Sequence, residues 1–289
     1  MNDHKELNLQ LFIDHWKSGK TKNDSVSHNK TFWDERAGFW EKTVIKGETD
    51  LDIINYIEKL LLDEGMLFKG AEVIDIGCGP GKFVASFAKT AGHVTALDFS
   101  DNMLIYAKEN AKKAGRDNIS FVSAPFQDID PKEMGWEKKF DLVFSSLCPI
   151  VGNYESMLKI SAMSKAYCFN RMYAYRKNEL LDNMRRALMG YEWETSINTN
   201  SIICTYAVIA LMGYYPRVVY MDTDSSYAHT LDDTSAREYA ALLDRSKEPD
   251  AEMMKKVQAY LETVTVDGVF TENIRTKSAL IWWNVNEKE

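Results

Sequence analysis

The hydrophobic and polar positions in the middle of the chain follow two alternating patterns, short apolar runs and longer amphipathic stretches. The apolar runs are rich in β-branched residues, which predicts buried strands. They lie at 71–76, 93–97, 118–123, 140–145 and 166–174. Between them, apolar residues recur at helical spacing over about 82–90, 101–114 and 154–163. Strands separated by helices of this length predict βαβ units and a parallel sheet that is covered on both faces.

The flanking parts of the chain are mainly helical in pattern. Before the first strand, helices are predicted at 6–16, 30–44 and 50–65, with a polar loop between the first two. After Lys177, helices are predicted at 178–190, 233–246 and 249–263. The closing stretch "DGVFTENIRTKSALIWWNV" predicts two strands joined by a short connection containing "TENIRT". We therefore expect an α/β fold with a seven-stranded, mostly parallel sheet over 70–289, an N-terminal helical segment over 1–69 and an inserted cap at about 191–232.

Composition and charge narrow the class of function. The 289-residue chain has 45% hydrophobic and 27% charged residues, which is typical of a soluble globular protein. Its net charge of −8 argues against a protein that binds nucleic acid through phosphate contacts. The N-terminal residues lack the apolar core of a signal peptide, and no apolar run reaches the length of a membrane span. The four cysteines have no metal-ligand spacing, so we expect no metal site and a reduced, cytoplasmic protein.

The stretch "VIDIGCGPGKF" joins a predicted strand to a helix through a loop with three glycines. The loop has the form D-x-G-x-G-x-G, from Asp75 to Gly81. A dinucleotide fingerprint, G-x-G-x-x-G, would have its third glycine where Lys82 stands, which argues against NAD or a flavin. Glycines here let the backbone pass close beneath a ligand. Asp98 ends the next strand, 21 residues after Gly77, and a carboxylate there can accept both hydroxyls of a ribose. The two features together indicate a ligand that contains adenosine.

Three stretches, "VIDIGCGPGKF", "VTALDFSDNMLIYAKENA" and "FDLVFSSLCPIV", resemble the successive motifs of class I S-adenosylmethionine-dependent methyltransferases. The resemblance covers roughly residues 70–175. "FWDERAGFW" is also similar to the N-terminal helix that many small-molecule members place over the cofactor. The resemblance implies a Rossmann-like fold, S-adenosylmethionine as the methyl donor and S-adenosylhomocysteine as the product.

The resemblance also implies roles for individual residues. Gly77, Gly79 and Gly81 would lie beneath the methionine part of the cofactor, and Asp98 would bind the ribose hydroxyls. The other residues expected to contact the cofactor are Asp75 and Ser145 near the methionine part, Phe99 and Met103 near the adenine, and Trp33 and Arg36 on the covering helix. For Asp75, Phe99 and Met103, a purely structural role stays open, and so does ordinary helix packing for Trp33 and Arg36.

One segment departs from the family. After the third strand, members commonly have an acid and a small residue that contact the adenine, whereas "FVSAPFQDID" has Ala124 and Pro125 at those positions. Proline has no backbone N–H to donate. The adenine contacts are therefore expected from Phe126, Gln127 or Asp128.

Candidates for catalysis lie in the C-terminal half of the chain. "YMDTDSSYAHT" brings Tyr227 and His229 together in one stretch, with His229 as the candidate general base. A surface or capping histidine is the alternative. Cys148, directly after the fourth strand, could be a nucleophile, line the site or only pack.

The features together predict a methyltransferase that transfers a methyl group to a small-molecule acceptor by in-line displacement. The alternatives are an RNA or protein methyltransferase and a cofactor-binding module without catalysis. We expect a small-molecule acceptor as the partner, with neither nucleic acid nor membrane, and leave open whether the protein forms a homodimer. The sequence does not identify the acceptor or the atom that is methylated.

Overall fold

The computed structural model describes residues 3–18, 29–44, 48–190, 196–197, 199–243 and 249–288. The chain folds into two compact units. Unit 1 comprises Met1–Met172, Thr199–Met221 and Ala279–Glu289, and unit 2 comprises Tyr173–Asn198 and Asp222–Ser278. The expected helical segment 1–69 and cap 191–232 have other bounds than these units and stay predictions.

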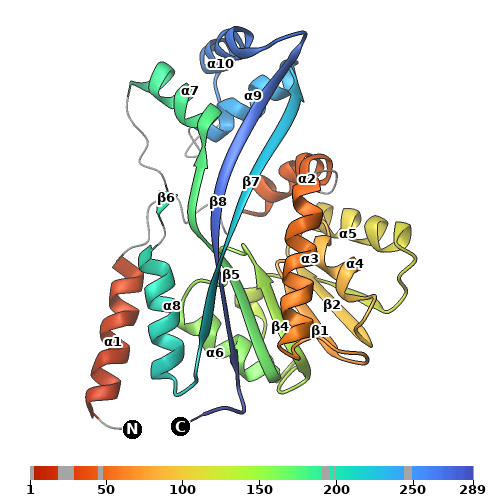
Figure 1. Cartoon of the computed structure of the whole chain (residues 1–289), viewed down its shortest axis with the longest axis vertical. Coiled ribbons are helices and arrows are strands. Elements are labelled where there is room, and N and C mark those ends of the chain that lie inside the picture. Colours follow the sequence, from red (N-terminus) through yellow and green to blue (C-terminus); the bar gives the residue numbers. More distant parts are fainter. Residues whose placement is uncertain are drawn as a thin grey trace. The chain divides into compact units, whose positions relative to one another are not determined.

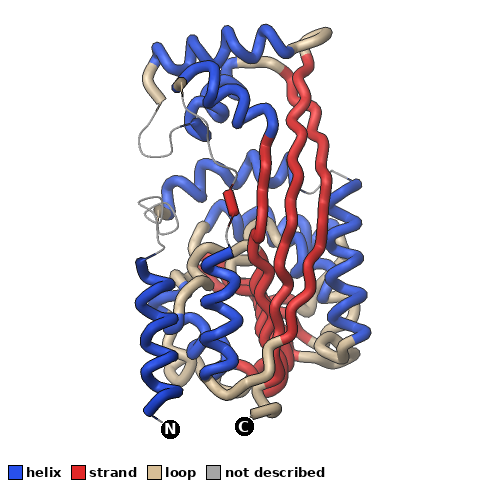
Figure 2. The backbone as a smooth tube through the Cα atoms, turned by 60° about the vertical axis from the view of Figure 1, so that its left-hand side comes forward, coloured by secondary structure: helices blue, strands red, loops and turns tan. Residues whose placement is uncertain are grey.

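A parallel sheet forms the centre of unit 1 (Figure 1, Figure 2). Its first strands are β1 (Glu72–Ile76), β2 (His93–Asp98), β3 (Ile119–Ser123) and β4 (Phe140–Ser146). These strands pair in parallel, and β4 pairs in parallel with β5 (Ser164–Asn178). The order of the sheet is β3-β2-β1-β4-β5-β8-β7. From β1 the chain adds β2 and β3 on one side, and it then adds β4 on the other side of β1. An open α/β sheet binds its ligand at such a switch point, here between β1 and β4.

Two further long strands, β7 (Arg217–Thr230) and β8 (Val269–Asn284), contribute residues to both units, as β5 does. The backbone N–H of Val285 donates to Ala166 at 2.8 Å, and Asn178 contacts Glu272. Because these contacts pair the start of β5 with the end of β8, β8 runs antiparallel to β5. The short strand β6 (Ser196–Ile197) pairs with β5 outside the main order. The predicted seven-stranded, mostly parallel sheet is confirmed.

Helices cover both faces of the sheet in unit 1, as predicted. They are α1 (Asp3–Ser18), α2 (Lys30–Val44), α3 (Glu48–Asp63), α4 (Lys82–Phe87), α5 (Asp101–Lys113), α6 (Tyr154–Met163) and α8 (Thr199–Leu211). On one face α3 contacts α4, and α4 contacts α5; on the other, α6 contacts α8, and α8 packs along α1 (Figure 1).

Period-two alternation along the strands places apolar side chains on both faces of the sheet, so that each face packs against its own layer of helices. Trp282 packs in the cluster that includes α3 and α4, whereas its neighbour Trp283 donates its indole N–H to Ser161 of α6 at 3.2 Å. Within the first cluster, the rings of Phe83 on α4 and Phe144 on β4 lie 5.0 Å apart. Buried aromatic pairs of this kind hold α4, and with it the loop that precedes α4, against the sheet.

Unit 2 is an antiparallel elaboration with its own core. It contains the later half of β5 and β7, the earlier half of β8, and the helices α7 (Glu179–Met189), α9 (Asp233–Leu243) and α10 (Ala251–Val264). Met184, Tyr239, Val257, Leu261 and Phe270 are buried together between these helices and β8.

The prediction of two short strands at the C-terminus is wrong, because residues 269–284 form one continuous strand, β8. "TENIRT" looks like a connection because Thr271, Asn273 and Arg275 are exposed. The residues between them, Glu272 and Ile274, are buried. This alternation is that of a half-buried strand. The insertion at about 191–232 contains α8 and the whole of β7, which the pattern also did not predict.

Among the described residues, no helix combines the length and the apolar character needed to cross a bilayer. The four cysteines are free thiols, and Cys78, Cys168 and Cys204 are buried. The described residues also contain no cluster of side chains suited to bind a metal ion.

Candidate functional site

The glycine loop lies between the end of β1 and the start of α4. Gly77, Gly79 and Gly81 have φ values of 70°, 54° and 80°, in the left-handed region that favours glycine. A Cβ on Gly77 would lie 2.9 Å from the Cβ of Cys148 and closer still to its sulfur, and a Cβ on Gly81 would lie 3.0 Å from Ala107. At Gly79 the nearest atom would be 4.0 Å away. Packing therefore requires two of the glycines, and the third leaves its backbone open to a ligand.

Asp98, at the end of β2, is joined to the glycine loop. Its Oδ2 accepts a hydrogen bond from the backbone N–H of Gly79, and its Oδ1 accepts one from Ser100, both at 2.9 Å. The side chain is buried, and burial raises its pKa although the backbone hydrogen bonds act in the opposite direction. A carboxylate has about four acceptor positions. Backbone hydrogen bonds from Gly79, Ser100 and Phe99 use part of this capacity, and the remainder is available to a hydroxyl group of a ligand.

Asp75 presents a second buried carboxyl group near the same loop. Only 2% of the residue is exposed, and its pKa is raised to about 8, first by burial and second by the negative charge of Asp98. Neither a cation nor a hydrogen-bond donor among the described residues counteracts this rise. A group that carries positive charge would suit this position, since it would stabilise the ionised carboxylate.

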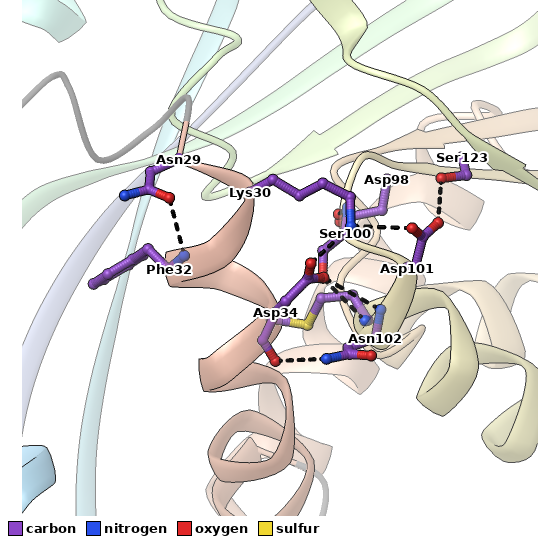
Figure 3. A network of polar contacts seen from close by, with 10 residues as sticks. Asn29, Lys30, Phe32, Asp34, Asp98, Ser100, Asp101, Asn102 and Ser123 are labelled. Carbon is purple, nitrogen blue, oxygen red and sulfur yellow. Dashed lines mark hydrogen bonds and ion pairs between the residues drawn. The ribbon is translucent and has the colours of Figure 1, made fainter.

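Helix α2 is fastened over the start of α5, directly after Asp98 (Figure 3). Asp34 accepts hydrogen bonds from the Ser100 hydroxyl at 2.5 Å and, through its main-chain oxygen, from Asn102 at 3.0 Å. Lys30 forms ion pairs with Asp34 at 2.7 Å and Asp101 at 3.0 Å. Ser100 thus links α2 to Asp98, because its backbone N–H donates to Asp98 and its hydroxyl donates to Asp34.

The charges in this network are matched. Burial would raise the pKa of Asp34, but hydrogen bonds from Lys30, Ser100 and Asn102 outweigh burial and lower it. The pKa of Asp101 is lowered by the hydroxyl of Ser123, which donates to it at 2.6 Å, and by Lys30. Both carboxylates are therefore ionised at neutral pH, and the contact between α2 and α5 is made between opposite charges and strong hydrogen bonds.

The glycine loop and the two acids lie at the tips of β1 and β2, and α2 is attached next to them at the start of α5. A family model described as a methyltransferase domain matches residues 67–229, which is more than half of the chain and includes all of these features except α2. The chain belongs to the class I S-adenosylmethionine-dependent methyltransferases. The resemblance found in the sequence motifs is thereby confirmed.

Individual methyltransferase relatives match parts of the chain. Putative methyltransferase 235L of Invertebrate iridescent virus 6 is 30% identical, over 44% of this chain and 45% of its own length. Phosphoethanolamine N-methyltransferase 1 of Triticum aestivum is 35% identical, over 32% of this chain and 18% of its own. An uncharacterized protein of Haemophilus influenzae is 23% identical, over 86% of this chain and 89% of its own. The chain therefore spans less than half the length of the viral and wheat relatives.

The residues of this methyltransferase fit S-adenosylmethionine. Gly79 offers open backbone, Asp98 has acceptor positions for the ribose, and Asp75 is a buried carboxyl group without a cationic partner in the described part of the chain. These are the groups that a nucleoside joined to a cationic methionine tail would need.

The structure places the remaining predicted cofactor residues around the same strand tips. Met103 is buried, and its sulfur is the nearest atom to the Cβ position of Gly79. Phe99 is half-buried between Asp98 and Ser100 in the chain. Ser145 is buried and its hydroxyl donates to the main-chain oxygen of Ile76 at 3.4 Å, so its side chain joins β4 to β1. The contacts of these residues with the cofactor stay predictions.

Trp33 and Arg36 are half-buried on α2. The guanidinium of Arg36 lies over the ring of Phe32, 4.9 Å from its centre, and the rings of Phe32 and Trp33 meet edge to face at 5.4 Å. These contacts organise one side of α2. The expected contact of Trp33 and Arg36 with the cofactor stays a prediction.

Cys148 packs against the glycine loop. Burial, followed by the negative charges of Asp98 and Asp75, raises the pKa of its thiol to about 12, against hydrogen bonds from the backbone of Ile150 and Val151. A thiolate is the reactive form of cysteine. The geometry and the pKa therefore favour packing over nucleophilic catalysis for Cys148.

The predicted catalytic residues, Tyr227 and His229, lie on β7 in unit 2, whereas the cofactor residues described above belong to unit 1. His229 Nε2 lies 3.3 Å from Oε2 of Glu272, and the ring is stacked on Phe270 at 5.3 Å. Tyr227 is a further ring neighbour, with its centre 6.5 Å from that of His229. Burial would raise the pKa of Glu272, but hydrogen bonds from His229 and Asn178 lower it.

Sequence reasoning missed several residues of these networks, namely Asp34, Glu272 and Asn178. The spacing of Lys30 and Asp34 on a helix could have indicated an exposed i,i+4 pair, but not that the same carboxylate also accepts from Ser100. Glu272 carries no local signal, because its partners lie far away along the chain. Asn178 could have been recognised as the N-cap of α7, where it accepts from the backbone N–H of Leu181, but not as a partner of Glu272.

Proposed function

We propose that this methyltransferase transfers a methyl group from S-adenosylmethionine to a small-molecule acceptor by in-line displacement. The observation that carries the proposal is the attachment of α2 beside Asp98. Asp34 and Lys30 fasten α2 to the start of α5, beside Asp98. A helix fastened over the donor favours an acceptor that can diffuse in beside it, rather than one fixed within a long polymer.

The charge of the protein supports the same choice. A net charge of −8 disfavours an RNA acceptor, since binding to RNA gains most of its affinity from cationic contacts with phosphates. The wheat relative is named for phosphoethanolamine, a small molecule, although this chain matches only 18% of that relative.

The chain's own residues would act mainly by binding and orientation. S-adenosylmethionine, when bound, supplies an activated methyl group on a sulfonium sulfur. Gly79 and Asp98 would hold the cofactor, Asp75 would face its positive charge, and α2 would exclude water. Alignment of an acceptor beside an activated donor can provide much of the rate acceleration.

An acceptor that keeps its proton at neutral pH also needs a general base. His229 and Tyr227 are the candidates that we propose. Glu272 would fix the proton of His229 on Nε2, since this nitrogen faces the carboxylate, and the other ring nitrogen would then be the basic one.

The proposal is tested first by calorimetric titration with S-adenosylmethionine and S-adenosylhomocysteine, with NAD as the control ligand. We expect both sulfur-containing nucleosides to bind. Asp98→Ala should weaken their binding by about 1–3 kcal/mol, because a buried acceptor of hydrogen bonds is lost. Glu109→Ala, on the exposed side of α5, is the matched control and should leave binding unchanged.

A panel of acceptors then separates the alternatives. Small amines, alcohols, thiols and carboxylic acids are incubated with labelled donor beside mixed tRNA and denatured protein. Turnover of a small molecule would support the proposed acceptor class. A rate that falls about 10²–10⁴-fold in His229→Asn, but not in His93→Asn, would support His229 as the general base. Methylation of tRNA or protein alone would refute the proposed acceptor, and cofactor binding without any turnover would favour a binding module.

A further inference from the structure

The segment after β3 lies next to Asp98. It has Ala124 and Pro125 at the positions where members of the family commonly have an acid and a small residue. The backbone N–H of Ala124 donates to the main-chain oxygen of Asp98 at 3.1 Å, which places this segment beside the tip of β2. A short 3-10 turn, η2 (Phe126–Asp128), follows Pro125. An elongated ligand that lies over the glycine loop and Asp98 would have its base next to this turn.

One cation holds the turn in place. The ammonium group of Lys159, on α6, donates hydrogen bonds to the main-chain oxygens of Phe126 at 3.0 Å and Gln127 at 2.7 Å. It also lies over the ring of Phe126, 5.1 Å from the ring centre. Phe126 is buried, so the lysine contacts both the backbone and the side chain of the same residue.

The environment of Lys159 indicates that these contacts compensate for the partial desolvation of its ammonium group. The residue is half-buried, and burial lowers its pKa against the opposing charges of Asp128 and Asp130. A lysine that gives up part of its hydration needs compensating partners. The carbonyl groups of Phe126 and Gln127 are such partners. The carbonyl group of Phe126 also accepts the backbone N–H of Ile129 at 3.2 Å, so the lysine adds to the hydrogen bond that closes the 3-10 turn.

We propose that Lys159 is a positioning residue that holds the backbone of residues 126–128 in the orientation that recognises the 6-amino edge of the cofactor's adenine. Pro125 cannot donate a backbone hydrogen bond, so recognition depends on the residues that follow it. The inference rests on the family's cofactor and is independent of the acceptor proposed above.

The test compares two ligands that differ only at the edge in question. S-adenosylhomocysteine and S-inosylhomocysteine are titrated by calorimetry into the wild type, Lys159→Met, Lys159→Gln and Lys159→Arg. Wild type is expected to prefer the adenine ligand. Lys159→Met and Lys159→Gln should weaken binding of the adenine ligand about tenfold. The ratio of the affinities for the two ligands should then fall close to one, whereas Lys159→Arg should restore most of the wild-type ratio.

Lys139→Met is the matched control, because Lys139 also lies over a phenylalanine ring, at 5.3 Å from the centre of Phe140, but outside this segment. It should leave the preference unchanged. If Lys159→Met weakens both ligands equally, the lysine has only a structural role and the inference is overturned. Failure of wild type to bind either ligand would overturn the cofactor assignment as well, so the two failures are distinguishable. Should Lys159→Met not fold, Lys159→Gln decides the outcome by the same ratio.

Discussion

At the scale of single residues, the buried carboxyl group of Asp75 has opposing effects on stability and on binding. Its folded pKa of about 8 lies above the ordinary value of 3.8. The folded state therefore holds the proton more tightly than the unfolded state, and the free energy of unfolding falls as pH rises from about 4 to 8. A bound cation would reverse this penalty by stabilising the ionised carboxylate.

Asp75→Asn removes the charge and keeps the shape. We expect the free energy of unfolding to rise at pH 8 by about 1–3 kcal/mol, with little change at pH 4. We also expect S-adenosylhomocysteine, whose amino group is cationic, to bind less tightly. Thermal unfolding at both pH values and calorimetric titration measure the two effects. Unchanged affinity would assign Asp75 to the core alone, which is the alternative that the sequence left open.

At the scale of elements, the glycine loop separates packing from binding. Ala at position 77 would strain a backbone with φ of 70° and would also collide with Cys148. Ala at position 79 would meet a similar strain but no close atom. The cost of left-handed backbone for alanine is about 1 kcal/mol.

We therefore expect Gly77→Ala to lower the free energy of unfolding by more than the strain alone, about 2–4 kcal/mol in total. Gly79→Ala should cost only about 1 kcal/mol of stability. It should also weaken binding of S-adenosylmethionine and S-adenosylhomocysteine, because its methyl group enters the space above the loop. Chemical denaturation and calorimetric titration of the two variants test this. Equal losses of stability, or intact binding in Gly79→Ala, would contradict the assignment of the space above Gly79 to the cofactor.

Helix α2 provides a second prediction at this scale. Asp34→Ala removes the acceptor of the Ser100 hydroxyl and half of the ion-pair network around Lys30. We expect faster proteolytic cleavage within α2 and an affinity for S-adenosylhomocysteine that falls about three- to tenfold, because the contact to α5 is a charge-assisted hydrogen bond.

Asp63→Ala is the control for this change, since Asp63 forms an i,i+4 pair with Lys59 on the surface of α3. Limited proteolysis of the two variants, with and without ligand, gives the comparison. If Asp34→Ala is cleaved no faster than Asp63→Ala, α2 is held by its other contacts and not by this carboxylate.

The elements show which signals a sequence carries. Helix α6 lies at 154–163, as predicted, since Asn153 caps its first turn by accepting from Ser156. The loop from Asp75 to Gly81 and Asp98 could be assigned to one site because their spacing fixes them on neighbouring strand tips. Asp34 could not be assigned, because its partner Ser100 is 66 residues away along the chain.

At the scale of the whole molecule, the parallel sheet and the helices α7, α9 and α10 were predictable, whereas the long strands of unit 2 were not. β1 and β4 are buried along nearly their whole length and read as apolar runs. β7 has half-buried and exposed residues in alternation through its later half, where polar side chains interrupt the apolar run that would have indicated a strand. Unit 2 is held by contacts between strands that are distant in sequence, such as that of Asn178 with Glu272, which no local pattern indicates.

Glu272 is the residue on which the stability of unit 2 should depend most clearly. Its carboxylate accepts hydrogen bonds from Asn178 at 2.5 Å and from His229 at 3.3 Å, which joins β5 and β7 to β8. Because its pKa is lowered from 4.5, the stabilisation is complete above that pH and is lost as pH falls through the folded value.

Glu272→Gln should therefore destabilise unit 2 by about 1–3 kcal/mol at pH 7, and the difference from wild type should shrink as the pH is lowered below 4. Amide hydrogen exchange is the measurement that resolves the units. We expect faster exchange over 222–230 and 269–278, with β1 and binding of S-adenosylhomocysteine preserved, because Asp98 and the glycine loop belong to unit 1. Glu262→Gln, on the exposed side of α10, should change neither. Equal acceleration in β1 would mean that the two units unfold as one cooperative body, and the network around Glu272 would then support the cofactor site as well.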